Sequence, residues 1–90
     1  MGYGSVSVGT GNATLILAAN SQRLSLIIVN GGSNNLYVGQ DAGVTTANTV
    51  FIVPNGTLTE DSGGTKMYCG PFYGCSAGTA TTADYWERTR

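Results

Sequence analysis

The sequence predicts an all-β fold: a small antiparallel β-sandwich or barrel of seven to eight short strands. Apolar runs of a few residues are separated by Gly, Asn, Asp and Pro, the pattern of strands joined by tight turns. Turn signals recur at intervals of roughly 8–12 residues, a spacing typical of sandwiches and barrels. No stretch has the periodicity of an amphipathic helix of useful length. The 90 residues fit one domain, residues 1–90.

The N-terminal segment is the least regular part of the pattern. Gly2–Asn12 is rich in Gly and Ser and contains one short alternating run, Val6-Ser7-Val8. Because glycine weakens a strand, we expect either a flexible N-terminal arm over residues 1–12 or a weak edge strand. The apolar run Thr14–Ala19 then predicts the first well-formed strand, and Asn20-Ser21-Gln22 predicts a turn.

Arg23–Asn30 (RLSLIIVN) is the strongest strand signal in the chain. Strict alternation places Leu24, Leu26 and Ile28 on one face, and Ile27 and Val29 on the other. Apolar residues on both faces predict a central strand that is covered on both sides. One cover is the core of the domain, and the other could be a partner subunit.

The next segments read as strands separated by turns. Gly31–Asn35 predicts a turn, because Gly and Asn tolerate positive φ, and with the strand Leu36–Gly39 it predicts a hairpin. Pro54-Asn55-Gly56 is a further turn signal, since proline cannot continue a ladder. Gln40–Asn48 and Gly70–Gly78 are expected to be loops. The remaining strands are expected at Thr49–Val53, Thr57–Glu60, Lys66–Cys69 and Thr79–Glu87.

Charge is scarce, which limits the classes of partner. Only 10% of the residues are charged and the formal net charge is −1, whereas typical soluble domains have about 25% charged residues. A nucleic-acid partner is not expected, because the four basic residues do not form the cluster that phosphates require. A membrane partner is not expected either, since no apolar run approaches a spanning length and no signal peptide is visible.

The side chains that carry most enzyme chemistry are missing or scattered. The chain contains no histidine, so it cannot form a Ser-His-Asp or Cys-His unit. Glu60-Asp61 is the one adjacent carboxylate pair, but neighbours on a strand point to opposite faces, which favours solvated turn residues. We therefore expect no enzyme activity and no catalytic, cofactor-binding or metal-binding residues.

Cys69 and Cys75 flank the expected loop Gly-Pro-Phe-Tyr-Gly. Two cysteines are too few for a zinc site, and their spacing differs from the C-x-x-C redox motif. The glycines and the proline would let the loop fold back, and a disulfide would then stabilise the fold by about 2–2.5 kcal/mol. Synthesis in a cytosol argues against oxidation. A possible disulfide and a pair of partly buried thiols both remain open.

Aromatic side chains supply the candidate interface residues. Phe72 and Tyr73 fall at the tip of the expected loop, where they form either a binding tip or a cover over the end of the core. In Tyr85-Trp86, one ring should face the core and the other a neighbour. The candidate interface residues are Tyr3, Tyr68, Phe72, Tyr73 and Trp86.

The central block resembles a recurring small β-domain of tailed bacteriophages. The shared features are an R-x-x-L-x-I-x-N strand (Arg23–Asn30), a Gly/Asn turn, a YVG strand, a D-x-x-V-T-T-x-N loop and an apolar-Pro-x-G turn. The likeness is best over Arg23–Glu60 and looser over Thr79–Glu87, which contains a final YWE. The loop Cys69–Cys75 is not part of the pattern.

This resemblance implies a virion structural protein, most simply a capsid decoration or cement protein that bridges neighbouring capsid subunits. The implied partners are the major capsid protein or another virion protein, together with further copies of the chain, with a trimer favoured. The implied location is the exterior of the particle, after synthesis in the host cytoplasm. The alternative is a tail, neck or fibre-associated module, structural or glycan-binding, with the aromatic residues as a stacking face. No catalytic residue carries over from the family.

Overall fold

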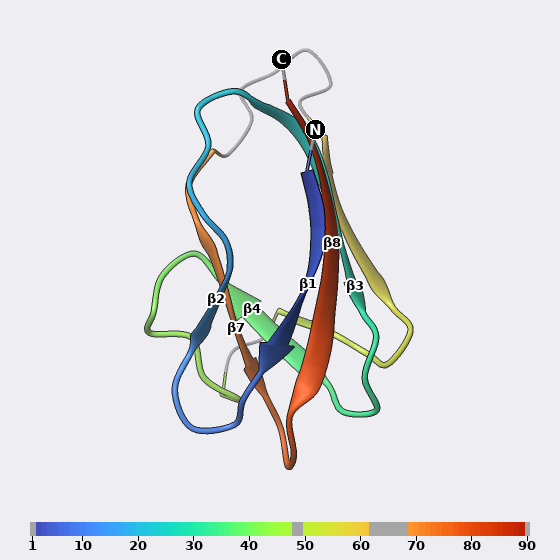
Figure 1. Ribbon diagram of the computed structural model, residues 1–90. Helices are drawn as coiled ribbons and strands as arrows, with labels where there is room; N and C mark the ends of the chain where they lie inside the picture. Colours follow the sequence, from blue (N-terminus) through green and yellow to red (C-terminus); the bar gives the residue numbers. More distant parts are fainter. Residues whose placement is uncertain (1, 48–49, 62–68, 90) are drawn as a thin grey trace.

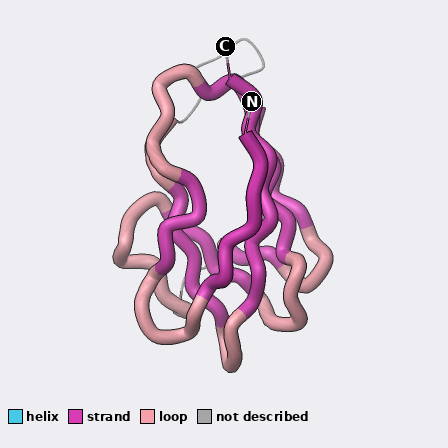
Figure 2. The backbone as a smooth tube through the Cα atoms, in the orientation of Figure 1, coloured by secondary structure: helices cyan, strands magenta, loops and turns pink. Residues whose placement is uncertain are grey.

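Eight strands in two antiparallel sheets form the described part of the chain, which comprises residues 2–47, 50–61 and 69–89 of a computed structural model. These residues contain no helix (Figures 1 and 2). The all-β sandwich predicted from the sequence is therefore confirmed. The strands are β1 (Gly2–Val8), β2 (Thr14–Leu17), β3 (Arg23–Asn30), β4 (Leu36–Gly39), β5 (Phe51–Ile52), β6 (Thr57–Asp61), β7 (Phe72–Ser76) and β8 (Thr81–Thr89).

Nested pairing determines the topology. The strand orders are β1-β8-β3-β6 in the first sheet and β2-β7-β4-β5 in the second. The pairs β1·β8, β2·β7, β3·β6 and β4·β5 are thus nested, as if one long antiparallel hairpin had been rolled into two layers. Contacts β3·β8 and β4·β7 complete the sheets. This arrangement is an eight-stranded jelly roll.

The strand pattern predicted from the sequence is mostly confirmed. The strands Arg23–Asn30 and Leu36–Gly39 have the predicted bounds, and four others are offset by one or two residues at one or both ends. Gly2–Val8 forms the edge strand β1, in line with the edge-strand alternative for this segment. The predicted strand Lys66–Cys69 lies almost entirely outside the described residues.

The predicted hairpin between β3 and β4 is wrong. The two strands belong to different sheets, and residues 31–35 carry the chain from one layer to the other. The Gly and Asn residues at 31–35 correctly predicted a sharp change in chain direction. They do not distinguish a hairpin from a crossing, because both need residues that tolerate unusual backbone angles.

The predicted loop Gly70–Gly78 is also wrong, since Phe72–Ser76 forms the interior strand β7 between β2 and β4. Phe72 is only 6% exposed and belongs to the core. A Cβ on Gly74 would lie 2.7 Å from Ile16 Cδ1 and 3.0 Å from Leu36 Cδ1. Glycine at this position therefore lets the core pack against the strand and does not mark a turn.

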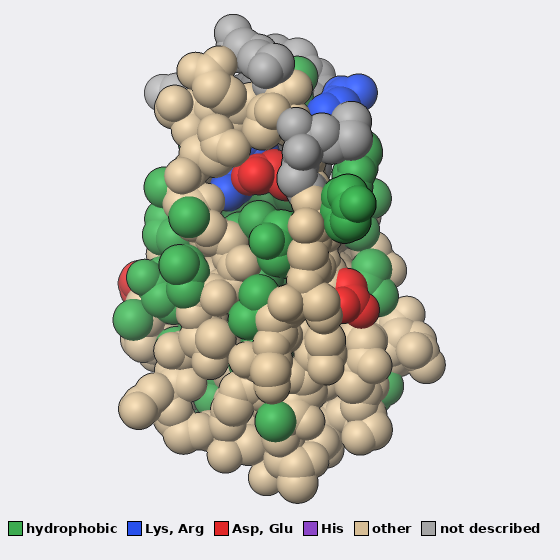
Figure 3. Space-filling view, viewed as in Figure 1, with side chains coloured by type: hydrophobic (Ala, Val, Ile, Leu, Met, Phe, Trp, Pro, Cys, Tyr) green, Lys and Arg blue, Asp and Glu red, His purple; other side chains and the backbone are tan. Residues whose placement is uncertain are grey.

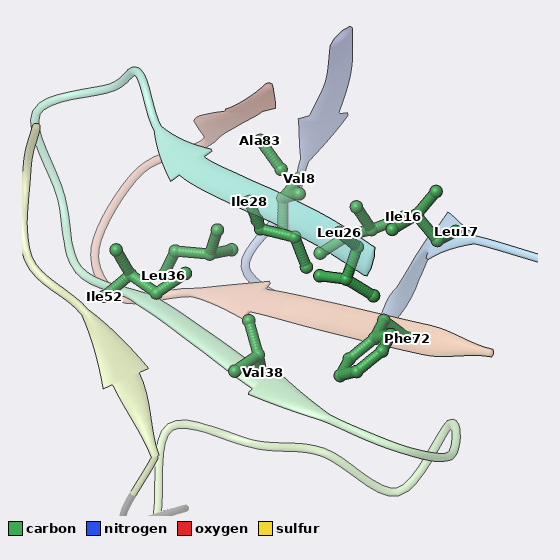
Figure 4. Packing of buried hydrophobic residues seen from close by; sticks show 10 residues of the cluster. All are labelled: Val8, Ile16, Leu17, Leu26, Ile28, Leu36, Val38, Ile52, Phe72 and Ala83. Atoms are coloured by element: carbon green, nitrogen blue, oxygen red, sulfur yellow. The ribbon is translucent and has the colours of Figure 1, made fainter. Parts of the chain in front are cut away.

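The core fills the space between the two sheets (Figure 4). Partly buried Val6, Leu58 and Tyr85 pack against its margin. Side chains from both layers interdigitate, so burial of apolar area holds the layers together. The fully packed residues are Val8, Ile16, Leu17, Leu26, Ile28, Leu36, Val38, Ile52, Phe72 and Ala83.

Two bulges adjust which side chains reach this core. The register of β2 on β7 shifts between Leu15 and Leu17, so both Ile16 and Leu17 are buried. The register of β3 on β8 shifts between Arg23 and Ser25. The extra residue turns Arg23 inward and leaves Leu24 half-exposed, so the prediction that Leu24 shares the core face is wrong.

Candidate functional site

A buried ion pair closes one end of the sandwich. Arg23 is 2% exposed, and its Nε donates to Glu87 Oε2 at 2.5 Å. Its Nη1 and Nη2 donate to the carbonyl oxygens of Gly70 (2.9 Å) and Ala18 (2.8 Å). The guanidinium carbon lies 5.7 Å from the centre of the Phe72 ring. The buried charge is thus matched by a carboxylate and by backbone acceptors, which makes this cluster structural.

Asn30 has the corresponding role at the other end of β3. Its Nδ2 donates to the carbonyl oxygens of Asn34 (2.6 Å) and Ile52 (2.8 Å). Its Oδ1 accepts hydrogen bonds from Gly32 N (3.1 Å) and Thr81 Oγ1 (2.7 Å). One buried side chain therefore joins β3, β5, β8 and the crossing segment, and its hydrogen-bonding capacity is used within the fold.

The carboxylates with described side chains are likewise held by structural contacts. Asp41 Oδ1 accepts from Gly43 N at 2.8 Å, which stabilises a loop turn. Asp84 Oδ1 accepts from Ser5 Oγ at 2.6 Å across the β1·β8 pair. Glu87 is committed to Arg23. Within residues 2–47, 50–61 and 69–89 no group of three or more His, Cys, Asp or Glu side chains could hold a metal ion.

The outer face of the β1-β8-β3-β6 sheet carries a cross-strand row of large side chains. Tyr3 lies opposite Trp86, and Trp86 lies opposite Ile27. Residues opposite one another on neighbouring strands share a face, so these three side chains stand side by side. Tyr3 is 81% exposed. The adjacent row contains the Ser5–Asp84 hydrogen bond, which places polar groups beside the aromatic ones.

The outer face of the β2-β7-β4-β5 sheet is more apolar. Leu15 lies opposite Tyr73, and Tyr37 lies opposite Phe51, with 5.5 Å between the centres of the Tyr37 and Phe51 rings. Leu15 is 45% exposed and Phe51 is 47% exposed. We call Leu15, Tyr37, Phe51 and Tyr73 the apolar patch. In the space-filling view, hydrophobic side chains gather on this side of the molecule, at the left (Figure 3).

The structure separates the candidate interface residues that the sequence predicted. Tyr3 and Trp86 lie together on one outer face, whereas Tyr73 lies on the other. Phe72 is a core residue and cannot be a binding tip, because its side chain is buried between the two sheets. Tyr68 lies outside the described residues. In the last strand, Tyr85 packs against the core as expected, and Trp86 faces outward.

Sequence reasoning missed three members of the apolar patch: Leu15, Tyr37 and Phe51. Each lies next to a core residue in sequence, as Tyr37 does between Leu36 and Val38. Alternation along the strand was the signal that could have found them, since every second side chain of a short strand leaves the core. Their aromatic or aliphatic character made them look like core residues instead.

The two cysteines are not joined by a disulfide. Cys69 is half-buried before β7, with its Sγ 3.9 Å from Arg23 O, and Cys75 is buried in β7, with its Sγ 3.5 Å from Thr10 O. The extended strand from Phe72 to Cys75 alone spans about 10 Å. A disulfide needs Cα atoms within about 7 Å of one another. The structure therefore shows the unbridged alternative.

A small apolar cavity opens at the side of the sandwich, between the ends of β4 and β6. Its volume is about 240 Å³, below the range of about 300–1,000 Å³ that is usual for small-molecule sites. It has room for an apolar side chain, and its lining is mainly apolar apart from Gln40. The lining residues are Val38, Gly39, Gln40, Val50, Leu58 and Phe72.

No family model matches the chain, and neither does a curated protein or a solved structure. The described residues form no helix that could cross a membrane. The outer faces of the two sheets and the sequence resemblance are therefore the features of the chain that bear on its function.

Proposed function

We propose that the protein is a non-enzymatic structural component of a bacteriophage virion, a capsid decoration or cement protein that bridges and stabilises neighbouring capsid subunits. The observation that carries this proposal is the apolar patch on the outer face of the β2-β7-β4-β5 sheet. Leu15 and Phe51 are each nearly half exposed there, on strands whose other face already fills the core. A patch of this kind is typical of a surface that another protein covers.

The scarcity of charge supports the same role. The chain has four basic and five acidic residues among 90, and Glu87 and Arg23 are buried against each other. The cores of protein interfaces are depleted of charge and enriched in aromatic residues. A surface with few charges and with exposed Tyr, Phe, Leu and Val residues fits a protein that acts by being packed between neighbours.

The resemblance to small virion β-domains adds a second line of support. In its R-x-x-L-x-I-x-N strand, the first and last residues are the buried polar residues Arg23 and Asn30, which hold the two ends of the sandwich. The motif therefore specifies this way of closing a small sandwich. Jelly rolls occur in viral capsid proteins and in lectins, so the fold is compatible with the proposal but does not select it.

The proposed partners follow from the role. They are the major capsid protein or another virion protein, bound on the exterior of the particle after synthesis in the host cytoplasm. Further copies of the chain are proposed as partners too, and three-fold positions of a capsid would favour a trimer.

The test compares particles with and without the protein. Particles that lack it should lose their genome at a lower temperature, and imaging should find many copies distributed over the shell. Equal heat resistance would contradict the cement role, and a few copies at one vertex would move the protein to the tail or neck.

Substitutions within the patch make the test specific. Leu15→Ser and Phe51→Ser should reduce the number of copies per particle while the isolated protein remains folded. Tyr3→Ser removes an exposed ring from the opposite outer face and is the matched control, with an unchanged copy number. Full occupancy by both patch variants would exclude the apolar patch as the capsid contact.

The alternative is a tail or fibre-associated module that binds a glycan, and one observation favours it. Tyr3 and Trp86 form an exposed aromatic surface beside the hydroxyl of Ser5 and the carboxylate of Asp84. Flat aromatic faces next to hydrogen-bonding groups suit the apolar and polar faces of a sugar ring. Binding on a glycan array that Trp86→Ala abolishes and Tyr37→Ala preserves would support this alternative. An array without binding would leave the structural role.

A further inference from the structure

The four edges of the two sheets differ in how well they are protected against pairing with another strand. Strand β6 is an edge that carries Glu60 and Asp61. Strand β2 is interrupted by a bulge, and β5 has only two residues. Charges, bulges and short length are the usual devices that prevent edge-to-edge association. Strand β1 (Gly2–Val8) has none of them.

Strand β1 is a long, regular and uncharged edge. All seven of its residues pair with β8 without a register shift, and no described strand pairs with its other edge. Its sequence, GYGSVSV, contains no charged residue and no proline. It runs along the front of the molecule in Figure 1. Such an edge presents a row of backbone N–H and C=O groups that can accept one more strand.

The sequence of β1 fits an antiparallel copy of itself. When two copies are centred on Ser5, every large side chain lies opposite a small one, so the side chains interdigitate without a clash. Residues that face each other also belong to the same face of the sheet, as pairing requires. The opposed pairs are Gly2 with Val8, Tyr3 with Ser7, Gly4 with Val6, and Ser5 with Ser5 of the second copy.

We propose that the β1 edge is a homodimer interface in which two copies of this chain pair β1 with β1 about a two-fold axis at Ser5. The two β1-β8-β3-β6 sheets then form one continuous eight-stranded sheet. A two-fold axis makes the interface self-complementary, so it closes at two copies and leaves no β1 edge unpaired. This pairing is independent of the proposed virion role, and it differs from the trimer considered there.

The first measurement is the mass of the full chain in solution, by sedimentation velocity and light scattering. The expected species is a dimer of twice the 9.2 kDa chain, with a monomer fraction that rises on dilution. Lysines on the edge should dissociate it, so Ser5→Lys/Ser7→Lys should raise the dissociation constant by about tenfold or more. Thr57→Lys/Thr59→Lys, on the opposite edge strand β6, is the matched control and should remain dimeric.

Crosslinking then tests the register. At the two-fold axis the two copies of residue 5 lie about 4.5–5.5 Å apart between Cα atoms, within disulfide range. Mild oxidation of Ser5→Cys should therefore give a covalent dimer. Ser7→Cys on the same strand should not, because its two copies lie about 13 Å apart along the sheet. A mixture of Tyr3→Cys and Ser7→Cys should crosslink, and the unaltered chain measures the background from Cys69 and Cys75.

Three results would overturn the proposal. One is that the unaltered chain is monomeric at a concentration of about 100 μM. The dissociation constant would then exceed that concentration, which is too weak for the interface of a stable assembly. Another is a dimer or trimer that the β1 lysines leave intact while circular dichroism shows a folded sheet. The third is equal crosslinking of Ser5→Cys and Ser7→Cys, which would exclude the register centred on Ser5.

Discussion

Arg23 and Glu87 meet between the two sheets, with 2.5 Å from the arginine Nε to the glutamate Oε2. They are 64 residues apart in the sequence, and they join the start of β3 to the C-terminal part of β8. The guanidinium also holds the carbonyl oxygens of Ala18 and Gly70. At this end of the sandwich the ion pair and its hydrogen bonds lie beside the Phe72 ring, so they continue the core with polar contacts that are matched.

Loss of Arg23 should be severe. Arg23→Met removes the cation and leaves Glu87 buried without its partner, which typically costs about 3–5 kcal/mol. A domain of this size has a free energy of unfolding of roughly 5–13 kcal/mol, so the variant should lose a large share of its stability. Urea unfolding followed by circular dichroism measures the loss. Arg88→Met removes an exposed cation from the same strand as Glu87 and should change stability by less than about 0.5 kcal/mol.

The double variant Arg23→Met/Glu87→Leu should recover part of that loss. It replaces both charges by apolar groups, so no buried charge remains unpaired. Recovery should be incomplete, because the carbonyl oxygens of Ala18 and Gly70 still lose their donors. A double variant as unstable as the sum of Arg23→Met and Glu87→Leu alone would show that the two side chains are not coupled.

Asn30 offers a second test at the opposite end of β3. Asn30→Ala removes two donated and two accepted hydrogen bonds in a fully buried position. We expect a loss on the order of 3 kcal/mol or more, since each buried group left unsatisfied costs about 1–3 kcal/mol. The exposed Asn12 is the control, and Asn12→Ala should be close to neutral. Chemical denaturation measures both, and equal stabilities would refute the role given to Asn30.

The sequence predicted well whatever depends on local pattern. The bounds of β3 and β4 follow from apolar runs that Gly and Asn interrupt, and the outward position of Trp86 follows from alternation in β8. The predictions that failed concern residues whose positions depend on contacts with residues distant in the sequence. Leu24 leaves the core because a bulge forms against β8, and Arg23 turns inward because Glu87 is there to receive it.

Strand β7 is a second case in which contacts distant in sequence decide the structure. Cys, Gly and Pro around Phe72 and Tyr73 looked like a loop, and the candidate binding tip followed from that interpretation. The strand forms because β2 and β4 both pair with it, and Gly74 is needed because Ile16 and Leu36 press against its backbone. Neither contact can be predicted from the local sequence. The exposed surface that could bind a partner is formed by Leu15, Tyr37 and Phe51, and Phe72 is not part of it.

The cysteines should behave as separate thiols. Adding a reductant should leave the melting temperature unchanged, because no disulfide crosslinks the native state. A thiol reagent should modify half-buried Cys69 faster than Cys75, which is 3% exposed. Mass spectrometry of the native protein, with and without reduction, checks the first point, and timed labelling checks the second. A mass increase of about two hydrogen atoms on reduction, or faster labelling of Cys75, would contradict the arrangement around β7.

Gly74 should tolerate no side chain, because the core occupies the space in front of it. In Gly74→Ala the new Cβ would lie 2.7 Å from Ile16 Cδ1, and overpacking of this kind costs about 1–3 kcal/mol. Ile16→Val removes that methyl group and alone costs about 0.5–1.5 kcal/mol. The double variant should therefore be more stable than the sum of the two single losses. Gly11→Ala, where nothing lies within 4 Å, is the control. Strictly additive losses in thermal unfolding would show that Ile16 does not exclude a side chain at residue 74, and β7 would then lie differently against β2.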